Sequence, residues 1–334
     1  MNVELAKLRT VDRVYKCLSG AIGSAAVIFL GLALAVLLYY AYPSILLNGV
    51  EFFRGTRWSA QLGGKIVTLN GVRTINGDSF GILVFVVGTL ASSTIAVLLA
   101  IPAGIGTAVF LTQVAPPKVA APISLMMETL AGIPSIIYGF WGFLVLGPFL
   151  VNDFEPLIAQ HLGFIPFLAG PVGGTSGLLA GGIILAIMII PIIASVSRDT
   201  MIRTPKELKE GARALGSTRW EVTRRIVLPF AKTAIVGSII LGLGRALGET
   251  MAIAMLLGAG NHQLPTSIYS PVSTIAAFML QELNIANAEP TGIDIAALME
   301  LATVLLMITV TVNVIARLLI KQGFAGSSEN VVRV

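Results

Sequence analysis

The sequence has few of the residues on which soluble enzymes and disulfide-rich proteins depend. Its 334 residues include one cysteine, Cys17, so no internal disulfide can form, and its two histidines lie too far apart to suggest a metal site. Charged residues make up 12% of the chain, about half of the roughly 25% that a soluble domain uses to cover its surface. We therefore expect no metal, no cofactor, and a surface that largely faces lipid.

Catalytic and nucleotide-binding motifs are also missing. The sequence has no Gly-x-x-x-x-Gly-Lys-Ser/Thr loop, so any ATP has to be hydrolysed on another polypeptide. It has no triad or pair of carboxylates suited to chemistry of its own, which predicts a non-catalytic protein. The net charge of +5 comes from basic residues beside apolar runs rather than from one folded face, which argues against nucleic acid as a partner.

Long apolar runs dominate instead. Hydrophobic residues make up 55% of the chain and the mean hydropathy is +0.89. Since a helix needs about 20 apolar residues to cross the hydrocarbon core, the sequence predicts an all-α integral membrane protein with about six transmembrane helices. The first run is too long for a signal peptide. Gly132 and Pro134 interrupt the third, which is either one rod or two half-helices. The runs are near residues 18–42, 81–112, 120–150, 175–197, 232–258 and 294–318.

Lys and Arg are unevenly distributed among the polar segments. If the N-terminus is in the cytoplasm, 17 of the 22 Lys and Arg residues fall in inner segments and four in outer segments, while Arg245 lies within a span. Because basic segments beside spans stay in the cytoplasm, both termini are predicted to be cytoplasmic.

Three outer segments follow from this topology. The longest, 43–80, carries turn signals at Asn48-Gly49, Asn70-Gly71 and Asn76-Gly77. The segment 259–293 is expected to contain a short interfacial helix over 271–285. The segment 151–174, rich in Gly and Pro, is expected to be the third outer connection.

Residues 198–229 form the only large charged block, and two short helices are predicted in it. Thr204 is expected to cap the first, with Pro205 at its first position and Glu207 completing a capping box, and Gly216 is expected to end it.

The second predicted helix begins with a capping box of Thr218 and Glu221. Val222 and Ile226 continue its apolar face, and Pro229 is expected to stop it.

The first of these helices is amphipathic, with Leu208, Ala212 and Leu215 on one face. Such a loop either rests on the membrane surface or inserts into a groove of a cytoplasmic partner. Part of it resembles the coupling motif of ABC importer permeases, a Glu-Ala-Ala triplet, a glycine and Ile-x-Leu-Pro. Gly211 departs from that motif by replacing alanine, which weakens the helix by about 1 kcal/mol. The resemblance implies docking into a cleft of an ATPase subunit. The matching residues are Glu210, Gly211, Ala212, Gly216, Ile226, Leu228 and Pro229.

Ionisable residues within the apolar runs are the candidates for function, because a charge at the bilayer centre costs about 2.5–3.5 kcal/mol. Arg245 and Glu249 are four residues apart, which would place them on one face of a helix. Glu128 and Glu300 are weaker candidates, with structural hydrogen bonding as the alternative. Asp294 is expected at the membrane edge.

Two compatible hypotheses fit Arg245 and Glu249. They form an ion pair that permits insertion, or Arg245 lines a pathway and grips an anion with its fork of donors while Glu249 holds the fork and offsets its charge. Gly244 and Gly248, also four apart, are predicted to allow close helix packing.

Three segments together resemble the phosphate-specific ABC transporter permeases of the C type. They are GLGRALGETMA at 242–252, LAGIPSIIYGFWG at 130–142 and LAIMIIPIIASVSRD at 185–199. The resemblance implies the type I ABC importer permease fold, a multi-pass protein of a bacterial inner membrane, and translocation roles for Arg245 and Glu249. It also implies the partners: a homologous second permease, two copies of an ATPase subunit and an extracytoplasmic phosphate-binding protein.

The expected organisation follows from these observations. Residues 1–80 hold a cytoplasmic segment, the first span and an outer loop; 81–320 form the transporter domain with the coupling loop 198–229; 321–334 form a cytoplasmic tail. Alternatives remain open at this point. The first is a permease for another oxyanion, such as sulfate or molybdate, or for a small solute. The second is a stand-alone transporter or channel driven by ion gradients. The third is a signalling or scaffold protein.

Overall fold

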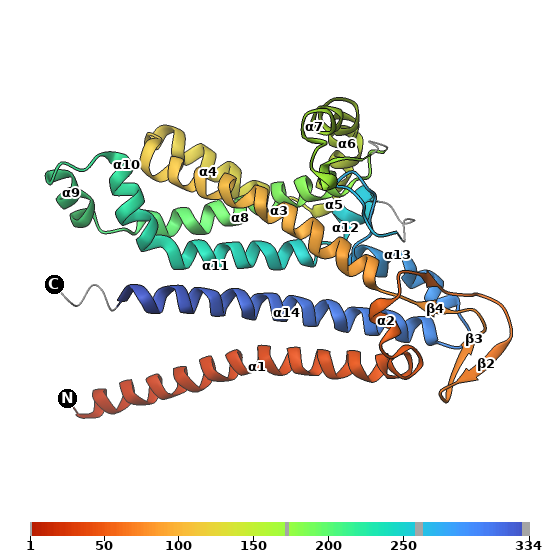
Figure 1. Cartoon of the computed structure of the whole chain (residues 1–334). Coiled ribbons are helices and arrows are strands. Elements are labelled where there is room, and N and C mark those ends of the chain that lie inside the picture. Colours follow the sequence, from red (N-terminus) through yellow and green to blue (C-terminus); the bar gives the residue numbers. More distant parts are fainter. Residues whose placement is uncertain (1, 171–173, 258–262, 329–334) are drawn as a thin grey trace.

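The structure, a computed structural model, describes residues 2–170, 174–257 and 263–328 and is mostly helical (Figure 1). Turns of π-helix at Phe110–Val114, Gly142–Leu146, Leu150–Phe154 and Thr223–Val227 extend or join several helices. The α-helices are α1 (Asn2–Asn48), α2 (Glu51–Arg54), α3 (Leu83–Val109), α4 (Pro117–Ala131), α5 (Ser135–Trp141), α6 (Gly147–Phe149), α7 (Glu155–Leu162), α8 (Leu178–Ile202), α9 (Lys206–Ala214), α10 (Arg219–Val222), α11 (Leu228–Leu247), α12 (Met251–Leu257), α13 (Ile275–Ala288) and α14 (Ile293–Ser328).

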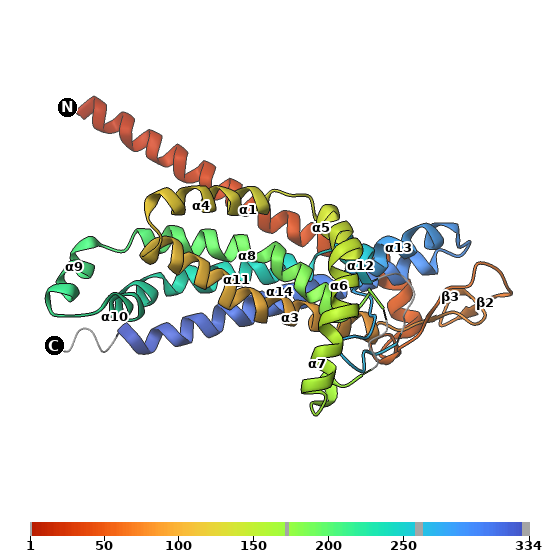
Figure 2. The same cartoon turned by 90° about the horizontal axis from the view of Figure 1, so that it is seen from above.

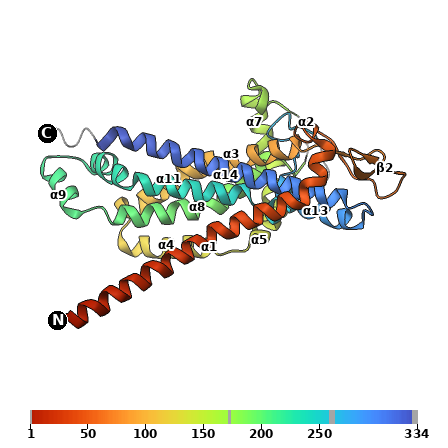
Figure 3. The ribbon, with the colours of Figure 1, turned by 90° about the horizontal axis from the view of Figure 1, so that it is seen from below.

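Figures 1 and 2 show a bundle formed by α3, α4, α8, α11 and α14, which run along a common axis, and by α1, which is inclined to them. α1 begins and α14 ends at the same end of the bundle, where α9 and α10 also lie. Seen from below, α1 crosses the bundle at an angle and its N-terminal part extends away from the other helices (Figure 3).

The prediction of six spans is confirmed. Within the described residues, six helical segments are long and apolar enough to cross a membrane: Val14–Asn48, Leu83–Val114, Ser135–Leu162, Leu178–Ile202, Arg219–Leu247 and Ile293–Leu318. The third of these turns across the bundle axis, whereas α4, which precedes it, runs along the axis (Figure 2).

The third span therefore differs in part from the expectation. The break between half-helices is present, at Gly132-Ile133-Pro134 between α4 and α5. Helix also continues to Leu162, through part of the segment expected to be an outer connection. The helix continues past Gly142, Gly147 and Pro148. The π turns on either side of α6 realign the backbone hydrogen bonds instead of breaking them.

The core of the bundle is the contact between α3 and α8. A Cβ added at Gly104 would lie 2.8 Å from Ile193, and one added at Gly182 would lie within 2.5 Å of Ile95, so the two backbones are as close as glycine permits. Ala96, Ala100, Leu185, Ile189 and Ile193 are buried there, together with Ile253 and Leu257 of α12.

Polar groups connect α3 and α8 to the segment that follows α12. Thr89 of α3 donates to Phe85 O at 2.7 Å and accepts from the Ile275 N–H at 2.9 Å. The N–H groups of Leu178 and Leu179 donate to Ser270 O and Ile268 O, which satisfies two of the donors left open at the start of α8.

The segment 43–80 contains four short strands that were not predicted. β2 (Ile66–Leu69) pairs with β3 (Val72–Ile75), and β1 (Trp58–Ser59) pairs with β4 (Ser79–Phe80), both antiparallel. The three predicted turns are confirmed, since Gly49, Gly71 and Gly77 all have positive φ. Asn70 and Gly71 are both left-handed, which gives the type I′ geometry that suits a hairpin.

The helix expected over 271–285 is present as α13, and its first half is buried. Ile275, Ala277 and Phe278 are buried, and Phe278 stacks on Phe85 of α3 with ring centroids 4.0 Å apart. The helix is capped by Thr274, which accepts from the Ala277 N–H. Its first half therefore belongs to the core at the end of the bundle opposite α9 and α10 (Figure 1).

Candidate functional site

Arg245 lies in the last turn of α11 and is half-buried. Within the described part of the chain its guanidinium makes no hydrogen bond or ion pair. Its charge acts on the phenol of Tyr138 in α5, so the guanidinium lies near the break between α4 and α5. Five donors in a fork geometry are thus available to a ligand or to another subunit.

Glu249 does not share a helical face with Arg245, because the fifth span is broken. α11 ends at Leu247, and α12 begins at Met251 after Gly248, Glu249 and Thr250. The Glu249 carboxylate accepts from the Ala252 N–H at 3.3 Å, so it caps α12, where a negative charge is favourable. No ion pair joins it to Arg245 in the part of the chain that is described. The expected pairing is wrong for this conformation.

Two broken helices meet beside Arg245. A Cβ added at Gly139 of α5 would lie 2.7 Å from the Ala252 Cα, so α5 and the first turn of α12 are in backbone contact. Tyr138 donates its hydroxyl to Leu130 O at 2.8 Å and thereby satisfies a carbonyl at the end of α4. Helix breaks in membranes expose polar backbone groups, which is why transporters place them at substrate sites.

Gly244 of α11 and Gly248, the C-cap residue of α11, have little close contact with other helices among the described residues. A Cβ at Gly244 would meet only Asn313 Nδ2 at 3.9 Å, and one at Gly248 only the Gly244 carbonyl at 3.7 Å. The predicted close packing is therefore absent within the described residues. The result is an open face beside the guanidinium.

The other two candidates lie elsewhere. Glu128 is exposed on α4 and shares a cavity of about 10 Å³ with Ser195 and Arg198 of α8. Glu300 of α14 is 4% exposed and lines a different cavity, to which neither α11 nor α12 contributes. The structure thus brings neither of them to Arg245.

Two buried carboxylates were not expected in the interior. Asp294, expected at the membrane edge, is 0% exposed, and Glu155 of α7 is 1% exposed; neither forms a hydrogen bond with a described residue. Burial, and then the charge of Glu155, raise the pKa of Tyr269, whose hydroxyl donates to Leu168 O. Apolar residues flank both carboxylates in the sequence, but each lies at the edge of an apolar run, where burial and exposure are equally compatible with the pattern.

The loop 198–229 folds into α9 and α10, with a different start than predicted. Pro205 is the N-cap of α9 and makes no side-chain cap, while Thr204 Oγ1 is buried with no hydrogen-bond partner among the described residues. The end is as predicted: Gly216 has a φ of +87°, Gly216 N–H bonds to Arg213 O, and Ser217 N–H bonds to Ala212 O. These are the two hydrogen bonds of a Schellman motif.

The second capping box is also confirmed. Thr218 accepts from the Glu221 N–H, and Glu221 accepts from the Thr218 N–H at 2.8 Å. Pro229, however, does not stop the helix. The Leu228 N–H bonds to Thr223 O through the π turn Thr223–Val227, so the helix passes through Pro229 into α11.

The apolar residues of this loop separate into inner and outer sets. Val222 is buried, and Ala212 and Ile226 pack with it against α3 and α11. Leu208, Leu215 and Trp220 are 52%, 89% and 62% exposed. We call these three exposed residues the outer surface of the loop. Trp220 was not predicted as part of it, although an aromatic residue in a charged loop was the available signal.

Comparison with known proteins identifies the family. A family model described as "Binding-protein-dependent transport system inner membrane component" matches residues 100–322. The chain belongs to this family. It is a multi-pass inner-membrane permease.

The curated relatives of this permease are phosphate transport system permease proteins. It is 40% identical over 286 residues to PstC 1 of Mycobacterium tuberculosis, covering 84% of this chain and 85% of the relative. It is 44% identical to PstC of Haemophilus influenzae, covering 73% and 76%, and 40% identical to PstC of Xylella fastidiosa, covering 92% and 90%. The permease therefore belongs with the C-type phosphate transport permeases, as the sequence motifs indicated.

A solved structure shows the same fold. The permease resembles a chain of the inward-facing MetNI methionine ABC transporter with a TM-score of 0.51 and 17% identity, covering 72% of this chain and 95% of that one. At this identity the likeness concerns the fold alone, which is that of ABC importer permeases.

The same substitution is expected to have opposite effects at two glycines of the loop 198–229. Gly211→Ala should stabilise α9 by about 1 kcal/mol, because Gly211 is inside the helix with open space around it. Gly216→Ala should destabilise it by about 1–2 kcal/mol, because Gly216 is left-handed. Amide hydrogen exchange of the α9 amides in the purified permease measures both. Equal effects of the two changes would contradict the assigned helix end.

Substitutions of Glu249 should distinguish a cap from a charge partner. Glu249→Gln keeps an oxygen that accepts from the Ala252 N–H, so phosphate uptake by cells that carry this variant is expected to stay within about threefold of wild type. Glu249→Ala removes the cap and should destabilise the start of α12 by about 1 kcal/mol, lowering uptake further. Uptake assays on both variants at matched membrane levels test this. A Gln variant as impaired as the Ala variant would show that the charge itself is needed.

Proposed function

We propose that this permease is the transmembrane subunit of an ATP-driven importer of inorganic phosphate and forms half of the translocation pathway. The observation that carries the proposal is the half-buried guanidinium of Arg245, unpaired within the described chain and placed where two broken helices meet. A guanidinium binds two oxygens of a phosphate at once, which suits it to this anion. The phosphate transport relatives support the same cargo.

The open face of α11 beside Arg245 supports a two-subunit pathway. In the proposed assembly, a homologous second permease covers this face and contributes the other half of the passage. Phosphate then binds between the subunits, with Arg245 as the primary contact. Glu249 belongs to the same site, because it fixes the turn that follows Arg245. Glu128 and Glu300 are given structural roles instead.

The energy for transport is proposed to come from two copies of an ATPase subunit. The permease itself is proposed to be non-catalytic and to need no cofactor. The loop 198–229 would dock into one ATPase through its outer surface, formed by Leu208, Leu215 and Trp220. A surface of one aromatic and two leucine side chains amid charges is typical of an interface anchor.

The remaining features support an assignment of the two ends of the bundle to the two sides of the membrane. Since α1 begins, α14 ends and α9 and α10 lie at one end of the bundle, and most Lys and Arg flank that end, we propose that this end is cytoplasmic. The strands of 43–80 and α13 then lie outside, where an extracytoplasmic phosphate-binding protein would dock. The transporter domain is proposed to span 81–320, with 1–80 and 321–334 as additions at either end.

Uptake of labelled phosphate by cells that depend on this permease tests the proposal. Unlabelled phosphate should suppress uptake more strongly than sulfate or molybdate does, and uptake should require the ATPase genes. Stronger suppression by sulfate or molybdate would assign another oxyanion. Transport by the permease alone in liposomes would show a stand-alone transporter instead.

A further inference from the structure

Asn313 places an amide side chain within the sixth candidate span, Ile293–Leu318. Within the described residues, neither its Oδ1 nor its Nδ2 forms a hydrogen bond, and Oδ1 is buried. An amide in a membrane span normally hydrogen-bonds to a neighbouring helix, because lipid offers it no partner. The amide of Asn313 is therefore held by nothing in this part of the chain and remains available to a ligand.

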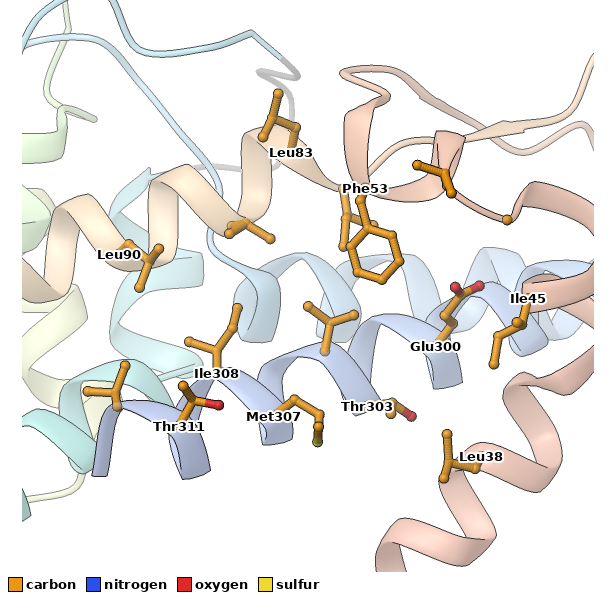
Figure 4. Close-up of a pocket in the computed structure, with 16 residues that line it drawn as sticks. Leu38, Ile45, Phe53, Leu83, Leu90, Glu300, Thr303, Met307, Ile308 and Thr311 are labelled. Carbon is orange, nitrogen blue, oxygen red and sulfur yellow. The ribbon is translucent and has the colours of Figure 1, made fainter. Parts of the chain in front are cut away.

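The helix α14 directs Asn313 towards α11. Figure 4 shows Thr311 beside Ile308, on the side of α14 that lines a cavity with α1 and α3. Asn313 follows Thr311 by two residues, which is about 200° around a helix, so it lies on the opposite side of α14. There its Nδ2 lies 3.9 Å from the position that a Cβ at Gly244 of α11 would occupy. The amide thus faces the backbone of α11 next to Arg245.

The lack of a side chain at Gly244 leaves this amide uncovered. Among the described residues, no other atom outside α11 lies within 4 Å of the position of that Cβ. Gly244, Arg245 and Asn313 are all half-buried, so the three lie where α11 and α14 reach the surface of the subunit. This surface belongs to the open face that the proposed second permease covers. The amide therefore borders the proposed passage, beside the guanidinium.

The chemistry of the amide complements that of Arg245. The guanidinium binds two oxygens of a phosphate in one plane, and the tetrahedral anion has further oxygens outside that plane. The amide nitrogen of Asn313 carries two N–H donors and no charge. It can add a hydrogen bond to the anion without adding positive charge. Recognition of the anion thereby improves while the anion remains free to leave, which a second arginine would prevent.

We propose that Asn313 is a second contact for the transported phosphate, and that its Nδ2 donates to one phosphate oxygen while Arg245 binds two others. The proposal rests on the proposed function, because it takes Arg245 as the primary contact. It adds α14 to the two broken helices that surround the site. It also gives a role to an amide that has no hydrogen bond to a described residue.

A cysteine at position 313 tests whether the transported anion reaches this side chain. Cys17, the only cysteine of the chain, is first replaced by serine, so that Asn313→Cys supplies the single thiol of the permease. The complete transporter, in membrane vesicles with ATP and the phosphate-binding protein, is treated with a negatively charged, water-soluble methanethiosulfonate. The thiol should react, and saturating phosphate should slow the reaction at least about fivefold, because the bound anion covers it.

The matched control is Val314→Cys. Val314 is 48% exposed on α14, so a thiol there faces lipid, where neither a thiolate nor a charged reagent is stable. It should react at least about tenfold more slowly, and phosphate should not change its rate. If Asn313→Cys reacts as slowly as Val314→Cys, or at a rate that phosphate leaves unchanged, the contact is wrong and the amide belongs to a helix of the second permease.

Two further substitutions separate contact with the anion from support of Arg245. Asn313→Leu keeps the size and removes the donors, so the maximal rate of phosphate uptake should fall about tenfold at matched levels of assembled transporter. Asn313→Asp replaces the donors with a carboxylate that repels phosphate, so uptake should fall at least about tenfold further. A residue that only positioned the guanidinium would give the reverse order, because the carboxylate would pair with Arg245. Uptake by Asn313→Asp that equals or exceeds that of Asn313→Leu would overturn the proposal.

The outcomes also separate this contact from the proposed function. If Arg245→Lys loses uptake while Asn313→Leu keeps it, phosphate import stands and the contact with Asn313 is wrong. If sulfate slows the modification of Asn313→Cys and phosphate does not, contact with an oxyanion stands and the proposed cargo is wrong.

Discussion

Replacing Arg245 by lysine is expected to reduce phosphate uptake by about ten- to a hundredfold while the permease still assembles. Lysine keeps the positive charge but lacks the planar fork that grips two phosphate oxygens, and a charge-assisted hydrogen bond is worth about 1.5–3 kcal/mol. Labelled phosphate uptake, normalised to the amount of permease and ATPase in the membrane, measures the effect.

The matched control is Arg317→Lys, since Arg317 is exposed in the last turn of the sixth candidate span, Ile293–Leu318. It should leave uptake within about twofold of wild type, because an exposed charge in solvent contributes little. If Arg245→Lys transports as well as Arg317→Lys, then Arg245 serves insertion or folding, and the proposed phosphate contact is lost. The fold and the family would be unaffected by that result.

Replacing Leu215 by aspartate is expected to separate the permease from its ATPase. Leu215 is 89% exposed next to the end of α9, and a charge there would have to be buried without a partner on docking. Interface anchors contribute about 2–4 kcal/mol, so copurification of the ATPase should fall by at least about thirtyfold and uptake should be lost. Trp220→Ala should act in the same direction.

The control for this prediction is Leu62→Asp. Leu62 is 58% exposed in the segment 43–80, so the same substitution is made at the other end of the molecule. It should leave ATPase binding unchanged. If Leu215→Asp and Trp220→Ala both copurify the ATPase at wild-type levels, the outer surface of the loop faces lipid headgroups instead of a protein.

The spans were predictable because their signal is length and apolarity, which the sequence carries directly. The same holds for features with a strong local cause: Gly132 and Pro134 break a helix, Gly216 ends one, and Asn70-Gly71 forms a hairpin turn. In each case a backbone restriction or freedom of one or two residues is enough to decide the structure.

The predictions from sequence failed where tertiary contacts or longer-range geometry determine the local structure. The break at Gly248–Thr250 contains no proline, and its signal was a glycine that also suited close packing. Pro229 stays in a helix because a π turn precedes it, and residue preferences do not predict that turn. The strands of 43–80 are two to four residues long, too short to show an alternating pattern.

The spacing of Arg245 and Glu249 could therefore be read from the sequence, but their geometry could not. A spacing of four places two side chains on one face only while the helix continues, and here it ends between them. Tyr138 and Gly139 lay inside a motif that was recognised as a whole, yet nothing local indicated that they contact α12. The meeting of α5 with α12 depends on how distant segments pack.

The π turn before Pro229 has a mechanical consequence. Because it keeps the chain helical from Arg219 to Leu247, 29 residues form one unbroken helix that bends where α10 passes into α11 (Figure 1). Trp220 lies near one end of this helix and Arg245 near the other. A displacement of α10 can thus reach the guanidinium along the backbone, without a relay of side chains between them.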